Sequence, residues 1–158
     1  MQTRPARRED ASVIASIYNQ GIEDRLATFE TRLHSPEEVA AWFDESHPII
    51  VVEADDRVVA YAATFSYRPR DYYRGVAEFS VYVDRDFRLQ GAGRMAMEAL
   101  VHAARQAGLW KLVSRIFVEN LGSRHLLASL SFREVGVYER HARLDGEWRN
   151  VVIVERLL

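Results

Sequence analysis

The stretch EFSVYVDRDFRLQGAGRMAMEALVHAARQAG, residues 78–108, decides the fold of this chain. Its first part is rich in β-branched and aromatic residues, as in a strand, and its last part repeats apolar residues three and four apart, as in a helix. Between them stand Gly91 and Gly93, which lower helix propensity and leave bare a first turn of unpaired N–H groups. Such a turn either holds phosphate at the positive end of a helix dipole or is a tight turn beneath a closely packed helix.

Two well-known nucleotide loops fit this turn poorly. The Rossmann pattern needs Gly-x-Gly-x-x-Gly, but Ala96 stands at the position of the third glycine. The pattern also needs an acidic residue at the end of a strand about 20 residues further on, and none is found. The Walker pattern needs a lysine directly after its last glycine, and the only lysine of the chain is Lys111. Nucleotide hydrolysis is therefore excluded, and a dinucleotide site is disfavoured.

Length and composition set the protein class. The 158 residues fit one domain, residues 1–158, whose core needs neither a metal nor a disulfide. Cysteine is absent, which excludes thiolate zinc sites and a cysteine nucleophile, and we expect no bound metal. The 21 basic and 23 acidic residues are interspersed, so we expect no broad contact with nucleic acid. Without an apolar leader or a long apolar run, we expect no membrane association and a cytoplasmic location.

Helix and strand signals alternate along the chain without a linker, and the predicted order begins with a strand. Asp10 is predicted to cap a first helix, and SPEE at 35–38 is typical of the start of a second. Three strand-like runs follow, then the helix after the glycine turn, a strand, a helix, and two closing strands near 134–141 and 148–157. The crossover through the glycine turn must be parallel. The sequence thus predicts an α/β domain with a mixed, mostly antiparallel sheet of about seven strands and about four helices.

The motif RLQGAG at 88–93, which follows the strand VYV at 81–83, resembles the pyrophosphate loop of the GNAT superfamily of acetyl-CoA-dependent N-acetyltransferases. The predicted element order is similar to that fold over nearly the whole chain. Residues 68–74, 77–83 and 118–120, with Ser123, resemble the branch that acetylates phosphinothricin, methionine sulfoximine and arsinothricin. The resemblance implies a GNAT-like fold, acetyl-CoA as cosubstrate, antibiotic resistance through acetylation of a small acidic amino acid analogue, and a homodimer.

The same resemblance assigns a cofactor site. Backbone amides of the loop would hold the pyrophosphate, the preceding strand would pair with pantetheine, and an N–H near Val81 would stabilise the oxyanion that forms on the thioester carbonyl. Asn120 matches the position that binds the cofactor arm, although a plain helix cap fits it equally well. The cofactor-binding residues expected on this basis are Val81, Tyr82, Val83, Arg88, Leu89, Gln90, Gly91, Ala92, Gly93, Arg94, Asn120 and Ser123.

Glu78 is a carboxylate in an otherwise apolar strand, where burial is costly without a purpose. Attack on a thioester requires a neutral amine, so a base must take a proton from the α-ammonium group. Glu78 matches the position of that base in the family. The alternative is a structural carboxylate paired with a nearby arginine.

The resemblance also implies an acceptor pocket, in which cationic and hydroxyl donors replace the water lost by an acidic amino acid. For the two arginines of Arg68-Pro69-Arg70, an exposed turn is the alternative. The substrate-binding residues expected are Phe29, Glu30, Arg68, Arg70, Tyr73 and Ser80.

Three positions depart from the family pattern. Leu127 stands where Tyr or His is common and cannot protonate a thiolate, although a thiol with a pKa of about 8.5 leaves tolerably without an acid. Ser131 replaces a glycine, and Asn150 replaces an aspartate in a closing hairpin that resembles the substrate cap of the branch. The alternatives are an acetyltransferase for another small amine or a protein N-terminus, and a non-catalytic CoA-binding module.

Overall fold

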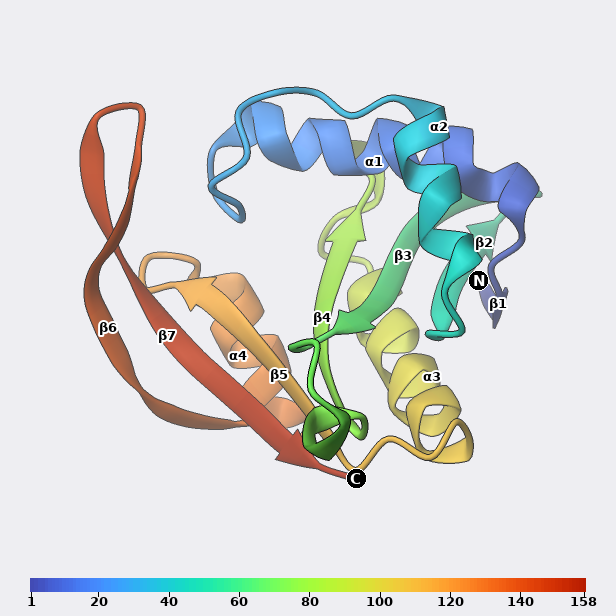
Figure 1. Cartoon of the computed structure of the whole chain (residues 1–158). Helices are drawn as coiled ribbons and strands as arrows, with labels where there is room; N and C mark the ends of the chain where they lie inside the picture. The colour runs from blue at the N-terminus through green and yellow to red at the C-terminus, as the bar shows by residue number, and fades with distance from the viewer.

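A single mixed sheet of seven strands runs through the computed structural model, which describes residues 1–158 (Figure 1). The strand order is β1-β2-β3-β4-β5-β7-β6, and only the β4–β5 pair is parallel. The strands are β1 (Gln2–Pro5), β2 (Ile49–Ala54), β3 (Arg57–Ser66), β4 (Val76–Val83), β5 (Lys111–Phe117), β6 (Arg133–Leu144) and β7 (Glu147–Leu157). The helices are α1 (Ala11–Asp24), α2 (Pro36–Ala40), α3 (Ala92–Gln106) and α4 (Leu121–Ser129). The predicted α/β fold and order of elements are confirmed.

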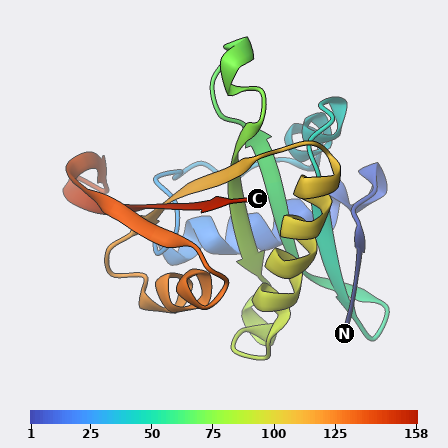
Figure 2. The same cartoon turned by 90° about the horizontal axis from the view of Figure 1, so that it is seen from below.

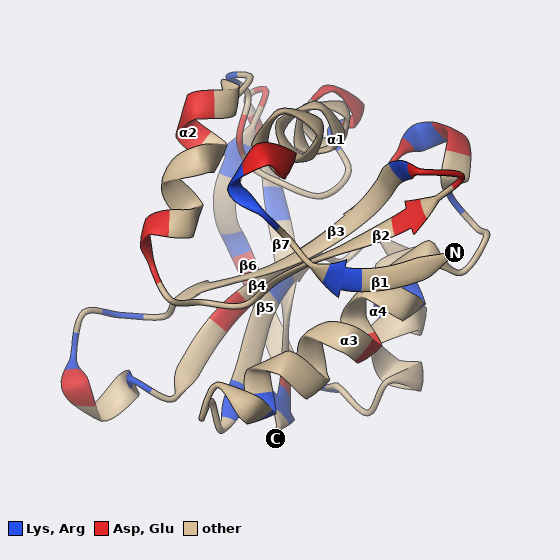
Figure 3. Cartoon of the chain, turned by 90° about the vertical axis from the view of Figure 1, so that its right-hand side faces the viewer, with Lys and Arg blue, Asp and Glu red and all other residues tan.

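Helices cover both faces of the sheet. Figure 3 shows α1 and α2 on one face and α3 and α4 on the other, with acidic and basic residues interspersed along the chain. Side chains alternate along β4, so Ala77 and Phe79 join the larger core against α3, whereas Tyr82 packs with the smaller core against α1. Successive side chains of β4 therefore pack in two different hydrophobic cores, one on each face of the sheet.

The strands β4 and β5 run together over three residue pairs and then separate, which Figure 1 shows as a V. Their pairing ends at Glu78 and Val113, while β5 stays paired with β7 as far as Phe117. At the fork, the Ser114 hydroxyl donates to the Phe79 carbonyl at 2.9 Å. Beyond it, β4 is paired with β3 alone.

The open edge of β4 exposes particular backbone groups. Because the Asp84 N–H donates to the Val59 carbonyl at 2.8 Å, backbone groups of even-numbered β4 residues face β3. Those of the odd-numbered residues Val81 and Val83 face the gap beside β5. This edge can pair with another extended chain.

Local sequence signals explain the helix starts in part. Ser35 accepts the Glu38 N–H at 3.2 Å with Pro36 in the first turn, as predicted, but α2 ends at Ala40 and continues as a 3₁₀ turn. Asp10 stands at the N-cap position of α1, as predicted, but its side chain makes no capping hydrogen bond to that helix. Its carboxylate instead accepts from the Arg7 N–H at 2.7 Å and from the Arg4 guanidinium at 2.8 and 3.0 Å, which closes the 3₁₀ turn before α1.

The closing hairpin is longer than predicted and projects away from the sheet (Figure 2). Its turn has positive φ at Asp145 (51°) and Gly146 (82°), the conformation that Asp-Gly favours in two-residue hairpins. Most residues of β6 are exposed on both faces. No helix of the chain is long and apolar enough to cross a membrane.

Candidate active site

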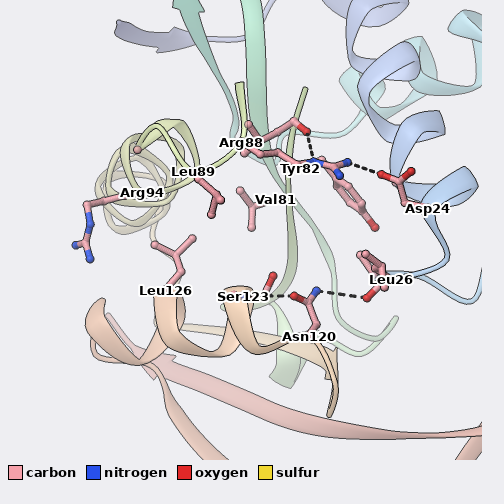
Figure 4. Close-up of a pocket in the computed structure, with 16 residues that line it drawn as sticks. Asp24, Leu26, Val81, Tyr82, Arg88, Leu89, Arg94, Asn120, Ser123 and Leu126 are labelled. Carbon is pink, nitrogen blue, oxygen red and sulfur yellow. Dashed lines mark hydrogen bonds and ion pairs between the residues drawn. The ribbon is translucent and has the colours of Figure 1, made fainter. Parts of the chain in front are cut away.

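A groove of about 460 Å³ lies where β4 and β5 separate (Figure 4). It is bounded by β4, the glycine turn, the start of α4 and the end of α1. Ten of the twelve predicted cofactor-binding residues line it: Val81, Tyr82, Val83, Arg88, Leu89, Gly91, Gly93, Arg94, Asn120 and Ser123. The other two do not, because the Gln90 amide donates to the Asp86 carbonyl at 3.2 Å and the Ala92 side chain is buried in the core.

The glycine turn presents backbone amides at the end of this groove. Leu89 and Gly91 have positive φ, 62° and 90°, and a Cβ atom built on Gly91 would meet nothing within 4 Å. In α3, the Gly91 carbonyl accepts the Met95 N–H, and the N–H groups before it lack intrahelical partners. This open, positively polarised turn fits a pyrophosphate group.

Arg88 crosses the groove to the end of α1. Its guanidinium contacts the Asp24 carboxylate at 2.6 Å (Figure 4). Arg85 contacts the same carboxylate at 2.9 Å. Desolvation raises the pKa of Asp24, but hydrogen bonds and charge from the two arginines outweigh it and hold this pKa below the usual value. Asp24 is therefore ionised at neutral pH, and Arg88 has an anionic partner when no phosphate is near.

Asn120 performs one of the two roles considered from the sequence, the helix cap, and makes a further contact across the groove. Its side-chain oxygen accepts the Ser123 N–H at 3.2 Å, which caps α4, and its amide nitrogen donates to the Leu26 carbonyl at 3.4 Å (Figure 4). The cap thus lies in the groove wall and connects α4 to the segment after α1.

A second, smaller cavity of about 220 Å³ lies on the α1 face of the sheet. We call it the acceptor cavity. Its lining residues are Tyr18, Ala27, Thr28, Trp42, Phe65, Glu78, Phe79, Ser80, Tyr82, Ser114 and Arg115. Two of them, Ala27 and Tyr82, also line the groove, so the two hollows meet at these side chains.

Four titratable side chains line the acceptor cavity. Burial is the main cause that raises the pKa of Tyr18 and of Tyr82, so both phenols are neutral hydrogen-bonding groups at neutral pH. Arg115 is a permanent cation. Glu78 is the remaining group that can accept a proton, and its Oε1 lies 2.9 Å from Nη2 of Arg115.

Of the six predicted substrate-binding residues, Ser80 lines the acceptor cavity and the other five lie outside it. Phe29 packs edge-on against Phe117 at 4.9 Å, and Glu30 lies 3.9 Å from His34. Arg68 and Arg70 are exposed on the loop between β3 and β4, which projects from the sheet in Figure 2. In the same loop, Tyr73 packs between Tyr67 and Tyr72, with centroids 5.2 and 4.8 Å away.

Sequence reasoning missed two residues that shape the site. Gly21 lies inside α1, where an added Cβ would come within 2.4 Å of the Tyr82 ring, so glycine makes room for that ring. Arg115 is the one charged residue within residues 112–117 of β5, the same signal that singled out Glu78 on β4. Each could have been found by asking why the residue breaks its local pattern.

The α4 helix offers no side-chain acid at the position where the family has one. Leu127 is 1% exposed and packs in the larger core. His125 is exposed on another face of the helix and lines neither hollow.

Known proteins match this chain over nearly its full length. The model of the acetyltransferase (GNAT) family matches residues 16–132. An L-methionine sulfoximine/L-methionine sulfone acetyltransferase of Pseudomonas paraeruginosa is 31% identical, over 96% of this chain and 91% of that protein. The L-amino acid N-acyltransferase MnaT of Escherichia coli is 30% identical, over 98% and 92%.

Solved structures agree with this assignment. A GNAT superfamily phosphinothricin acetyltransferase from Sinorhizobium meliloti, in complex with acetyl-CoA, superimposes with a TM-score of 0.92 at 25% identity, over 99% of this chain and 88% of that one. This chain belongs to the GNAT acetyltransferase family and is an acetyl-CoA-dependent N-acetyltransferase.

Proposed function

We propose that this enzyme acetylates the α-amine of a small acidic amino acid analogue of the phosphinothricin, methionine sulfoximine or arsinothricin type, and so confers resistance to it. The observation that carries the proposal is the junction of two hollows at Ala27 and Tyr82. One hollow has an anion-binding turn, and the other has a carboxylate beside a guanidinium. This arrangement suits direct transfer within a ternary complex.

The groove residues would hold acetyl-CoA, which supplies an acetyl group activated as a thioester. Backbone amides from Leu89 to Arg94 would hold its pyrophosphate, and Arg88 would provide a cation beside them. The N–H and carbonyl groups on the open edge of β4 would pair with its extended arm. The Val81 N–H is then the donor nearest the junction, where it stabilises negative charge developing on the acetyl oxygen.

Glu78 would take the proton that the acceptor's ammonium group must lose. Tyr18 and Tyr82 are neutral, and Arg115 cannot accept a proton, so no other side chain lining the acceptor cavity can act as a base at neutral pH. Leu127 is buried and cannot protonate the departing thiolate. The thiolate is stable enough to leave unaided, and the second proton, which the nitrogen loses after its attack, passes through water to the thiolate.

The identity of the acceptor class rests on the relatives and on charge. The similar proteins named above act on amino acids or their sulfoximine and sulfone analogues. Arg115 in the cavity and Arg68 and Arg70 on the neighbouring loop supply positive charge for an acidic acceptor. By family resemblance we also propose a homodimer, which light scattering would reveal.

A panel of amines tests the proposal through release of free CoA thiol. We expect turnover with phosphinothricin, methionine sulfoximine, methionine sulfone or arsinothricin, and far less with polyamines, aminoglycosides or a peptide with an alanine N-terminus. Preferred turnover of the peptide or of a simple amine would contradict the acceptor class. Binding of acetyl-CoA without turnover of any amine would indicate the non-catalytic module instead.

A further inference from the structure

The acceptor cavity is lined by one full positive and one full negative charge, and they are paired with each other. Glu78 is the last residue of β4 that pairs with β5, and Arg115 lies on β5 two residues beyond Val113, the partner of Glu78, with 2.9 Å between Oε1 and Nη2. The two side chains are 34% and 49% exposed, so both remain open to the solvent that an acceptor would displace. The ion pair is therefore accessible to exchange.

A zwitterionic α-amino acid matches this pair charge for charge. Its ammonium and carboxylate groups are attached to the same carbon, so an amine placed beside Glu78 brings the carboxylate within reach of the neighbouring Arg115. We propose, building on the function above, that Arg115 binds the α-carboxylate of the acceptor and that this binding releases Glu78 to act on the amine. The planar guanidinium suits a carboxylate because it donates two parallel hydrogen bonds.

The geometry favours Arg115 over the arginines on the loop. β5 holds Arg115 opposite Ile153 of β7, within an unbroken antiparallel ladder, so its backbone is fixed at the cavity. Arg68 instead lies over the Tyr67 ring, 5.1 Å from its centroid, on a projecting loop. The loop arginines can serve a distal acidic group of the acceptor, whereas Arg115 lies beside the base.

This exchange of ion-pair partners would let the enzyme distinguish acceptors that carry an α-carboxylate from those that do not. An amine without an adjacent carboxylate leaves Arg115 paired with Glu78, which then has a competing partner. An α-amino acid removes that partner as it binds. Arg115 would thus select acceptors with a free α-carboxylate and couple their binding to the availability of the base.

The test compares two acceptors that differ only in this group, L-methionine sulfone and its carboxamide, in wild type and in Arg115→Gln. The quantity measured is the ratio of kcat/KM for the two acceptors, because amine basicity then cancels between the enzymes. We expect Arg115→Gln to reduce the preference for the free acid by roughly 10- to 100-fold, the loss of one charge-assisted contact. Turnover of the carboxamide should stay within threefold or rise, and Arg115→Lys should retain part of the preference.

Arg133→Gln is the matched control, since Arg133 also pairs with a glutamate, Glu155 at 3.1 Å, but lines neither hollow. Unfolding temperatures establish that each variant is folded. The proposal is overturned if Arg115→Gln lowers turnover of both acceptors equally, because Arg115 then only positions Glu78, or if it changes neither.

If wild type acetylates neither acceptor, the proposed function fails, but the carboxylate site can still be decided. Calorimetric binding of L-methionine sulfone and its carboxamide would then be compared in wild type and Arg115→Gln, both with CoA present. Preferential binding of the free acid by wild type alone supports Arg115 as its anchor. Equal binding by both proteins, or none, refutes it.

Discussion

The two ends of β4 differ in what lies beside them. At the closed end, Val76–Glu78 pair with β5, and the Trp110 and Lys111 N–H groups donate to the Gly75 carbonyl at 2.7 and 3.2 Å. Packing there is so close that a Cβ atom on Gly75 would lie 2.0 Å from the Trp110 ring. At the open end, residues 79–83 pair only with β3, and one edge of the strand faces a groove.

The groove therefore arises because β4 lacks a second neighbouring strand at residues 79–83, and not because the sequence of β4 is unusual there. The sequence of β4 is apolar and β-branched at both ends, and its side chains continue to alternate between two faces. Strand β5 diverges from β4 because it remains paired with β7 along its whole length. Unpaired amides that would be costly in a core become binding groups when an amide-bearing ligand pairs with them.

The largest expected effect follows from removing the base at the fork. Glu78→Gln keeps the shape of the side chain but cannot accept a proton, so kcat should fall by roughly 10² to 10⁴ while acetyl-CoA affinity stays near wild type. Steady-state kinetics with phosphinothricin as acceptor measure this. Glu134→Gln is the control, since Glu134 also pairs with an arginine, Arg124 at 2.8 Å, away from both hollows. A Glu78→Gln variant within threefold of wild type would make Glu78 structural.

A smaller effect is expected at the glycine turn beyond the open end. Gly91→Val places a branched side chain where we expect phosphate, so the acetyl-CoA Kd should rise roughly tenfold or more. The strain of φ +90° should cost about 1 to 2 kcal/mol of stability. Acetyl-CoA stabilises wild type by about 2.7 kcal/mol at a hundredfold excess over its Kd, so thermal unfolding reports the loss.

Gly108→Val is the matched control for the turn. Gly108 has φ +86° and, like Gly91, nothing within 4 Å of an added Cβ, but it lies after α3 and lines neither hollow. It should show the same strain and normal acetyl-CoA binding. Equal binding by the two variants would reduce the glycine turn to a structural feature.

The smallest effect concerns the boundary between the two ends. Ser114→Ala removes the hydroxyl that donates to the Phe79 carbonyl, so the free energy of unfolding should fall by about 1 kcal/mol. Urea unfolding measures it. If the hydrogen bond from Ser114 determines where β4 and β5 separate, the affinity for acetyl-CoA should change as well. An unaltered affinity would mean that the β5–β7 ladder alone fixes the fork.

The sequence predicted what is local and missed what depends on contacts across the sheet. The glycine turn, the Ser35 cap and the order of elements are set by neighbours in the chain, and all three were predicted. The separation of β4 from β5 depends on how β5 pairs with β7, some forty residues later, which no local pattern encodes. Asp10 illustrates the limit, since its cap was predicted from one residue and replaced by a contact with Arg4 on β1.

The site was predictable to the same extent. Glu78 stood out as a charge in an apolar strand, but its partner Arg115 lies 37 residues away and meets it only because the two strands are neighbours. Phe29 was placed in the acceptor pocket, whereas in the structure it packs edge-on against Phe117 and does not line the acceptor cavity.

The central claim, that the open edge of β4 binds the acetyl-CoA arm, is tested most directly by amide hydrogen exchange at Val81. The Val81 N–H faces the groove, whereas the Tyr82 N–H faces β3 and serves as an internal reference for general stabilisation by the ligand. We predict that saturating acetyl-CoA slows exchange at Val81 roughly tenfold or more relative to Tyr82. Equal slowing of both amides, in protein shown to be saturated, would contradict the claim and place the cosubstrate elsewhere.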